Sequence, residues 1–476
     1  MPTIGMEIDI SSLLEAATTG DSNQIIHAAQ PLLERGAPAA ELLGRVGMIT
    51  AHGDNEGHAI LTLDAAAALS RLVSALPPLA DQNPESHIRE LPLLVQALTA
   101  TTSATHAGQM ADTTYPEPFF PSQLPEGKTV SEYMHNAVYN NDVTMAERLL
   151  FGLYGTGADY RTMEVRTYDG ISTTFQNAGH PLMYAVRGFQ LLDAVEWGDR
   201  APHILHWVAP HLPLHTEEPA WIDDVRTFNE NPAHSLESLR TRLAAPQEEK
   251  ALPLRRLIMS DANTTQICQG VYDALIKGGA SPRGVGSVIA LTAAELMQMV
   301  SDGDRDAFVL AAHGLLFSAA VRLVYAQVQD IDALPLLFTS AAYINALQKS
   351  LLQATAGTPQ TPSLTGAIGG GLIASSLLDN LYTQLDTQDL SGAIATAQRY
   401  LRLGNEKRAL FAIIALIAAQ ADAVADQGHT LQIVQAAAEE LMAWPHALAN
   451  INTQPFLQVA LRAAAFAKRN TIVKTL

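Results

Sequence analysis

Four histidines in this chain share a local sequence context that could bring them together in space. His58, His180, His313 and His429 follow one another at intervals of 122, 133 and 116 residues. Three of them follow a glycine, whereas His313 follows Ala312, and each is followed by apolar residues at helical spacing. Imidazole is the commonest side-chain ligand of transition metals near neutral pH. Histidines that converge from several helices would therefore form a metal site.

Other polar groups near these histidines could complete such a site. The carboxylates of Glu56 and Asp426 come two and three residues before the nearest histidine and are candidate ligands. We expect Glu56 or His52 to move protons, and the metal to act as a Lewis acid or redox centre. A single cysteine, Cys268, excludes disulfides, Fe–S clusters and cysteine-type zinc sites. The predicted cofactor is a transition metal held by imidazole and carboxylate, first iron, with zinc or manganese as alternatives.

A structural role for the same histidines stays open. A histidine at the start of a helix can cap that helix or bind a backbone group. Four neutral imidazoles that met without a metal would each need a hydrogen-bond partner. Capping and metal binding are therefore the two alternatives for these residues.

The sequence around the four histidines indicates an internal repeat. In each case an apolar segment ends at a glycine, a second helical segment follows, and the histidine opens a third. The glycines, typical of the residue after a helix, are Gly36, Gly157, Gly279 and Gly404. The glycine-to-histidine gaps are 22, 23, 34 and 25 residues, so the third unit is predicted to carry an insertion.

Composition predicts an all-α fold. Hydrophobic residues make up 48% of the 476-residue chain, and alanine and leucine, both strong helix formers, dominate. The sequence contains no convincing alternating strands, and the best short candidate is "TYDGISTTF", residues 167–175. We predict four degenerate helical repeats packed around a central pocket lined by histidine.

The expected boundaries follow changes in composition. Helical repeats are predicted at 1–110, 131–227, 254–353 and 372–476. A proline-rich connector (111–130), a second connector (228–253) and a Gly/Thr/Pro-rich loop (354–371) separate them.

Two further groups of histidines are assigned no catalytic role. The stretch "HILHWVAPHLPLH" contains four histidines, which we expect to be solvated or to lie around the site: His203, His206, His211 and His215. His135 follows Ser131, the expected N-cap of its helix, and is expected to sit on that helix.

Charge and motifs exclude several classes of protein. A net charge of −19 disfavours nucleic-acid binding. The longest apolar stretch, "ALFAIIALIAAQADAVA", is interrupted by Gln420 and Asp422, and "MPTIGMEIDI" resembles no signal peptide. We therefore expect a cytoplasmic protein without a membrane partner. Dinucleotide-binding, P-loop, H-E-x-x-H and G-x-S-x-G motifs are absent from the sequence.

One resemblance to known proteins points to oxygen chemistry. The stretch "STTFQNAGHPLMYAVRGFQLLDAVEWGDRAPHILHWVAPHL", with "AHGDNEGHAILTLDAAAAL" before it, resembles His-rich all-helical questin-oxidase-like proteins and the helical domains attached to Rieske modules. The resemblance implies an oxygen-using enzyme with an aromatic or polyketide-like substrate. A single cysteine cannot hold a Rieske cluster. Electrons would come from a donor protein or from the substrate, or would not be needed.

The function predicted from the sequence is a metal-dependent, non-haem iron oxidoreductase acting on a small organic substrate. One alternative is an α-solenoid-like interaction protein without chemistry, in which the histidines cap helices. Another is a cofactor-free oxygenase that uses histidines as general bases.

Overall fold

The computed structural model describes residues 8–50, 58–76, 88–106, 114–195, 201–237, 239, 246–327, 331–354 and 374–475. These residues form α-helices joined by turns and short 3₁₀ segments, and they contain no β-strand beyond one isolated bridge between Ala421 and Arg469. The prediction of an all-α fold is confirmed.

The N-terminal half holds eleven of the described helices. They are α1 (Ser11–Thr19), α2 (Ser22–Glu34), α3 (Ala39–Thr50), α4 (His58–Ser74), α5 (Leu91–His106), α6 (Val130–Tyr139), α7 (Val143–Gly155), α8 (Tyr160–Gly170), α9 (His180–Asp193), α10 (Ala201–Val208) and α11 (Trp221–Glu230).

The C-terminal half holds ten more within the described ranges. They are α12 (Pro253–Ile258), α13 (Thr264–Tyr272), α14 (Pro282–Met299), α15 (Arg305–Gln327), α16 (Pro335–Ala354), α17 (Ala374–Asp386), α18 (Leu390–Arg402), α19 (Lys407–Ala418), α20 (His429–Met442) and α21 (Gln454–Phe466).

The same order of elements occurs in each of the four expected units. A helix ends near a glycine, a second helix follows, and a third helix carries the histidine and packs against a fourth. The glycines have left-handed φ values, as a residue that ends a helix requires: Gly36 (86°), Gly157 (71°), Gly279 (79°) and Gly404 (76°). The helix ends predicted at these glycines are confirmed, and descent of the units from one repeat stays a prediction.

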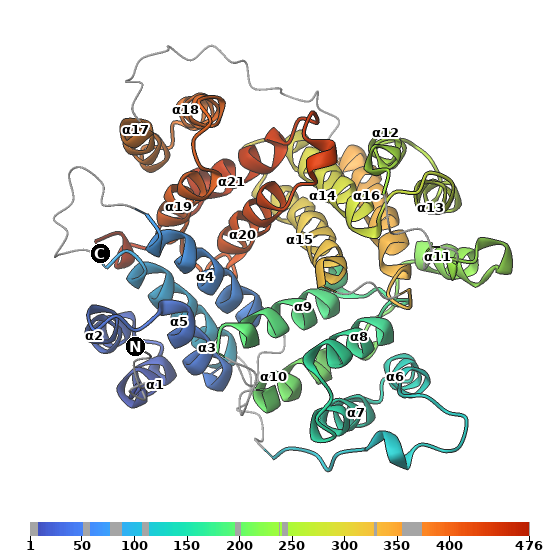
Figure 1. Cartoon of the computed structure of the whole chain (residues 1–476). Helices are drawn as coiled ribbons and strands as arrows, with labels where there is room; N and C mark the ends of the chain where they lie inside the picture. Colours follow the sequence, from blue (N-terminus) through green and yellow to red (C-terminus); the bar gives the residue numbers. More distant parts are fainter. Residues whose placement is uncertain are drawn as a thin grey trace, which may run out of the picture.

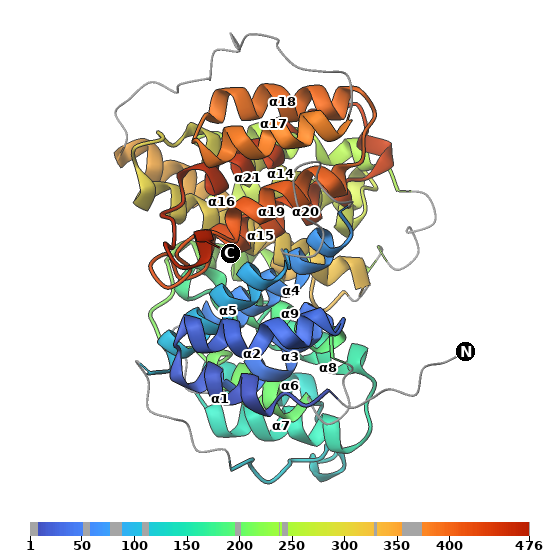
Figure 2. The same cartoon turned by 90° about the vertical axis from the view of Figure 1, so that its left-hand side faces the viewer.

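Four helices, one from each unit, surround the middle of the molecule: α4, α9, α15 and α20 (Figure 1). In the perpendicular view, α17 and α18 lie at one end of the molecule and α6 and α7 at the other, with α4, α9 and α15 between them (Figure 2). Buried aliphatic and aromatic side chains from both halves form one continuous hydrophobic core. The four central helices are therefore held on all sides.

The longest described helix, α15, is long and apolar enough to cross a membrane, by length and composition alone. The most apolar 18-residue window within Arg305–Ala326 has a mean hydropathy of 1.9, and 67% of that window is buried inside the protein. A helix that is apolar on all faces is also what the core of a large globular protein needs. The contacts of α15 with α14, α16, α9 and α20 account for that composition.

The best candidate for a strand, residues 167–175, does not form one. This stretch forms the end of α8 and the turn after it. The hydroxyl of Thr167 donates to the carbonyl of Met163 at 2.8 Å, which satisfies this β-branched residue inside a helix.

The expected connectors differ in structure. In 111–130 the described part is extended and contains a short 3₁₀ turn, Pro121–Gln123. In 228–253 the described part holds the end of α11 and further 3₁₀ turns. The loop 354–371 lies outside the described residues except for its first residue. The boundaries between units stay predictions.

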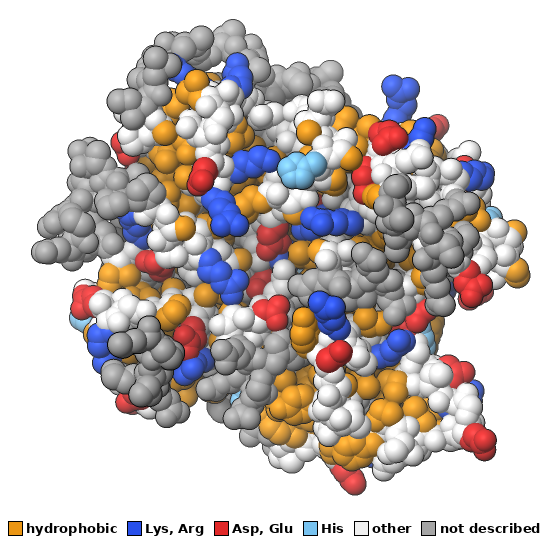
Figure 3. Space-filling model, viewed as in Figure 1, with side chains coloured by type: hydrophobic (Ala, Val, Ile, Leu, Met, Phe, Trp, Pro, Cys, Tyr) orange, Lys and Arg blue, Asp and Glu red, His pale blue; other side chains and the backbone are white. Residues whose placement is uncertain are grey.

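The face of the molecule seen in Figure 3 carries charges of both signs. Basic and acidic side chains are interspersed across its middle, with hydrophobic side chains between them (Figure 3). Neither sign of charge gathers into a separate patch on this face.

Candidate metal centre

The four predicted histidines lie together. The helices that carry them, α4, α9, α15 and α20, meet in the middle of the molecule (Figure 1). Nε2 of His58 is 3.3 Å from Nε2 of His180, and Nε2 of His313 is 3.4 Å from Nε2 of His429. Taken in chain order and back to His58, neighbouring ring centroids are 4.9–5.0 Å apart. We call these four side chains the histidine ring.

The four positions are not equivalent within their helices. His58, His180 and His429 are the first residues of α4, α9 and α20, as expected. His313 lies in the middle of α15, so the prediction that it opens a helix is wrong. Gly179 and Gly428 interrupt the helical backbone before His180 and His429, whereas Ala312 allows α15 to continue from Arg305.

Backbone carbonyls fix the tautomer of three of these imidazoles. In each case Nδ1 lies at the carbonyl oxygen of a residue three or four positions earlier. The pairs are His180 with Asn177, His313 with Val309 at 2.9 Å, and His429 with Asp426 at 2.6 Å. Because a carbonyl oxygen can only accept, Nδ1 carries the proton, and Nε2 of the neutral ring presents a lone pair. Such a carbonyl–imidazole bond is the usual support of a metal-ligating histidine.

His58 completes the ring from a different local setting. Its Nδ1 atom is buried and has no hydrogen-bond partner among the described residues. The residue three positions earlier belongs to 51–57, outside those residues.

Two turns with left-handed backbone deliver His180 and His429. Gly179 (φ 83°) follows Ala178 (φ 53°), and Gly428 (φ 73°) follows Gln427 (φ 53°). A Cβ atom on Gly428 would lie 2.0 Å from Oγ1 of Thr62, and one on Gly179 would lie 2.2 Å from the ring of Phe317. Only glycine fits either place, which explains why glycine precedes His180 and His429 in the sequence.

The ring is neutral at physiological pH. Burial is the largest cause of the lowered pKa values of these imidazoles, and for His58 and His180 repulsion from the other imidazoles comes next. The pKa is lowered to about 2 for His58, to about 3 for His180 and to about 4 for His313, and that of His429 is lowered as well. Neutral imidazole is the form that binds a metal ion.

The predicted carboxylates do not enter the ring within the described structure. Asp426 accepts hydrogen bonds from the hydroxyl of Thr430 (2.5 Å) and from the backbone N–H of Gly428 (2.9 Å), so it shapes the turn before α20. It supports His429 through its carbonyl. Glu56 and His52 lie outside the described residues, and their roles stay predictions.

The ring offers the nitrogen set of a transition-metal site. One ring nitrogen each from His58, His313 and His429 lies within 4.8 Å of the other two, and His180 adjoins His58. At a metal–nitrogen distance of about 2.0–2.1 Å, two ligands of a tetrahedral ion are about 3.4 Å apart. The two short nitrogen–nitrogen distances match that spacing.

Two pockets reach the ring from the surface. One has a volume of about 140 Å³ and is lined by His58, Thr62 and part of α5. The other, of about 90 Å³, is lined by His429 and by parts of α15 and α21. Small molecules could thus approach the ring at either of two adjacent histidines.

Comparison with protein-family models, with curated protein sequences and with solved structures gives no match in any of the three searches. The resemblance to questin-oxidase-like proteins therefore stays a prediction. The candidate site rests on its own geometry.

The histidines of residues 203–215 form no common centre within the described structure. Nδ1 of His203 lies 3.1 Å from the hydroxyl of Tyr115, and His206 pairs with Glu147. His215 bonds the carbonyl of Pro210. The imidazole of His211 meets the ring of Tyr184 edge to face, and Tyr184 adjoins His180, so only this member lies near the histidine ring.

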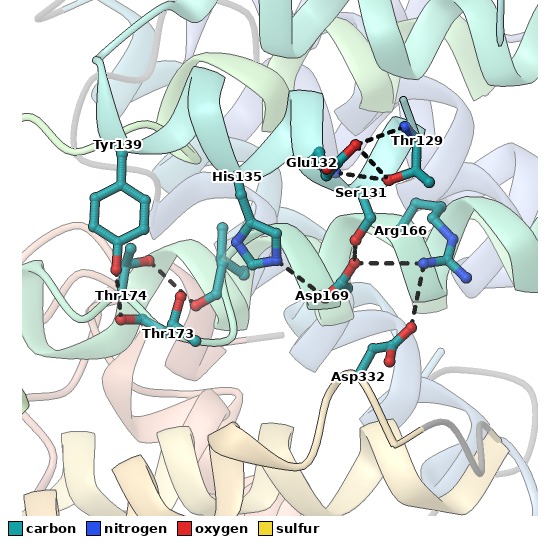
Figure 4. A network of polar contacts seen from close by, with 11 residues as sticks. Thr129, Ser131, Glu132, His135, Tyr139, Arg166, Asp169, Thr173, Thr174 and Asp332 are labelled. Carbon is teal, nitrogen blue, oxygen red and sulfur yellow. Dashed lines mark hydrogen bonds and ion pairs between the residues drawn. The ribbon is translucent and has the colours of Figure 1, made fainter. Parts of the chain in front are cut away.

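His135 belongs to a separate polar cluster around Asp169 (Figure 4). This buried carboxylate accepts from Ser131, from Nε2 of His135 at 3.2 Å and from Arg166 at 3.4 Å. Arg166 also lies 3.5 Å from Asp332, which joins α8 to the segment before α16. Asp169, Arg166 and Asp332 each have a partner of opposite charge or a hydrogen-bond donor, as is typical of a structural cluster.

The N-cap expected at Ser131 is wrong. Thr129 caps α6 and forms a capping box with Glu132, whereas the hydroxyl of Ser131 binds Asp169 (Figure 4). The thiol of Cys268 is buried, and burial raises its pKa to about 12, in agreement with an inert cysteine.

Sequence reasoning missed a second polar group in the four central helices. Further along these helices lie Asp64 on α4, Arg187 on α9, Arg322 on α15, and Glu439 and Glu440 on α20. We call these five residues the charged layer. Nη1 of Arg187 lies 2.8 Å from Glu439 and 3.6 Å from Asp64, and Arg322 pairs with Glu440.

A sequence signal for the charged layer did exist. Asp64 interrupts a helix that is otherwise apolar on nearly every face, and a charge in such a place must be buried with a partner. Burial raises the pKa of Asp64 to about 6 and that of Glu440 to about 7, although Arg187 and Arg322 oppose the shifts.

Proposed function

We propose that this protein is a metal-dependent oxidoreductase that holds a non-haem iron ion in the histidine ring and acts on a small organic molecule. Zinc and manganese are the alternative ions. Imidazole nitrogen suits iron and zinc, and an ion held by three of the four imidazoles keeps an open position for a substrate or dioxygen.

One observation carries this proposal: the nitrogen lone pairs of the ring face one another. Nε2 of His313 and Nε2 of His429 are 3.4 Å apart, and both imidazoles donate from Nδ1 to a carbonyl. Two acceptors cannot form a hydrogen bond, and burying them face to face costs free energy. A cation bound between them removes this cost.

The chain's own residues would prepare the site. Carbonyls of the preceding turns hold three rings in the metal-binding tautomer, and burial keeps the rings unprotonated. When bound, iron would supply Lewis-acid or redox chemistry. Glu56 and His52, next to His58 in the sequence, would move protons, and a donor protein could supply electrons.

Metal analysis tests the proposal. Purified protein, and protein reloaded with Fe(II), Zn(II) or Mn(II) under anaerobic conditions, is expected to retain about one ion per chain. The double variant His58→Ala/His180→Ala should fall to background. The control His446→Ala, which changes an exposed histidine outside the ring, should bind like the wild type.

Three results would overturn the proposal. Equal metal content in the wild type and the double variant would remove the ring as the site. Turnover of a phenolic substrate by metal-free protein would favour a cofactor-free oxygenase. Absence of both metal and turnover would favour an interaction protein.

A further inference from the structure

The pocket beside His429 is built from three segments that converge on the histidine ring. They are the turn before α15 with its first residues, the turn into α20, and the end of α21. His429 lies in its wall, and so does Val309, whose carbonyl holds His313. A ligand in this pocket would therefore contact His429 itself and Val309, the residue whose carbonyl holds His313.

The walls of this pocket are largely apolar. Phe308, Ile433 and Phe466 line it, and Phe466 is 40% exposed, which is unusual for a large aromatic side chain. The volume of about 90 Å³ is well below the roughly 300–1,000 Å³ of sites for drug-sized ligands. Both features suit a small molecule with an aromatic or aliphatic body.

The acidic groups of the pocket already have donors. Asp302 lies 2.7 Å from Nε of Arg462, Asp304 accepts from the N–H of Ala307 at 3.0 Å, and Asp426 is bonded within its own turn. Each of these carboxylates therefore already has at least one donor within the protein.

The basic groups differ in how much of their hydrogen-bonding capacity is used. Arg462 pairs with Asp302, donates to the carbonyl of Met297 at 3.1 Å and covers the ring of Phe308. Arg305 has one ion pair in the described structure, at 3.7 Å to Asp426, and its side chain is 47% exposed. Its guanidinium can therefore bind an anion with both arms.

The helices add to the preference for negative charge. α15 begins at Arg305 and α20 begins at His429, so the positive ends of a 23-residue and a 14-residue helix lie at the pocket. The neutral histidine ring adds no negative charge that would repel an anion.

We propose that this pocket binds the organic substrate and that the substrate is a small carboxylate or phenolate, its anionic group held by Arg305 and its apolar body by Phe308 and Phe466. This inference rests on the proposed function, because it names the substrate class of the same site.

Binding of matched probes tests the substrate class. Benzoate, benzamide and benzylamine share a ring and differ in charge, and their affinities for metal-loaded protein can be measured by calorimetry. Wild type should bind benzoate best. Arg305→Gln should weaken benzoate binding about tenfold or more and leave benzamide unchanged, because one charge-assisted contact is lost. The control Arg256→Gln changes an exposed arginine outside the pocket and should have no effect.

The outcomes separate this inference from the proposed function. Benzoate binding that Arg305→Gln does not weaken, or tighter binding of benzylamine than of benzoate, overturns the substrate class even where metal binds. Benzoate binding that depends on Arg305 in a protein that binds no metal supports the pocket and overturns the metal centre alone.

Discussion

The histidine ring and the charged layer lie in the same four helices and treat buried polar groups in opposite ways. In the charged layer each carboxylate lies beside a guanidinium, so the protein itself supplies the partners. In the histidine ring the nitrogens of His313 and His429 meet as acceptors. A buried polar group therefore indicates a binding site when its neighbours within the protein cannot pair with it, as when two hydrogen-bond acceptors face each other.

The largest effect is expected from breaking the charged layer. Arg322→Met leaves Glu440 buried without its guanidinium, and the free energy of unfolding should fall by about 3–5 kcal/mol at pH 8. The double variant Arg322→Met/Glu440→Leu should recover most of this loss. Denaturant titration of the metal-free proteins measures both.

The matched change in the ring should be mild. His313→Leu in metal-free protein removes an acceptor that faces another acceptor, so the loss should stay below about 1 kcal/mol. Two outcomes would contradict the contrast between the two regions. In one, the free energy of unfolding of the double variant Arg322→Met/Glu440→Leu is as low as that of Arg322→Met. In the other, His313→Leu lowers the free energy of unfolding as much as Arg322→Met does.

An effect intermediate between these two is expected from the turn before His429. Gly428→Ala places a Cβ atom against Thr62 in a left-handed turn, so the free energy of unfolding should fall by about 2–3 kcal/mol. Its metal affinity should fall as well. Gly404→Ala is the control, because Gly404 has a similar φ but open space around it, and it should cost about 1 kcal/mol without changing metal affinity. Equal losses in the two variants would mean that strain alone matters.

The last effect concerns pH. The pKa of His58 is about 2 in the folded protein and about 6.5 when unfolded, so below pH 6.5 the unfolded chain binds more protons. The stability of metal-free protein therefore falls as the pH drops from 6.5 towards 4. His58→Gln should reduce this slope by up to about 1.4 kcal/mol per pH unit.

Two acids act in the opposite direction and serve as an internal reference. The raised pKa values of Asp64 and Glu440 give stability that is present below their unfolded pKa values and is lost as the pH rises through about 6 and 7. The variant leaves both acids in place. An unchanged slope in His58→Gln, measured by denaturant titration at pH 7, 6 and 5 with a chelator, would contradict a neutral ring.

Much of the fold could be predicted because its signals are local. Alanine and leucine content predicts helices, and a glycine after an apolar segment predicts a helix end, as at Gly36 and Gly404. His180 and His429 could be singled out because the turns before them admit only glycine, so each is preceded by a glycine in the sequence.

The rest depends on contacts between distant segments. The position of His313 inside α15 is an exception, because a local signal did exist: Asp302, Gly303 and Asp304 mark the turn before Arg305, and Asp304 accepts from the N–H of Ala307. The pairing of Arg322 with Glu440 joins two helices 118 residues apart in the chain, and neither residue alone announces its burial. Thr129 rather than Ser131 caps α6 because Asp169 competes for the serine hydroxyl.

The two shortest nitrogen–nitrogen approaches in the ring each fall within one half of the chain, His58 with His180 and His313 with His429. An ion bound by both pairs would link the two halves of the chain. All four histidines could bind it only after the last helices had been synthesised and had packed against the first. Metal occupancy would therefore indicate that the whole chain had folded.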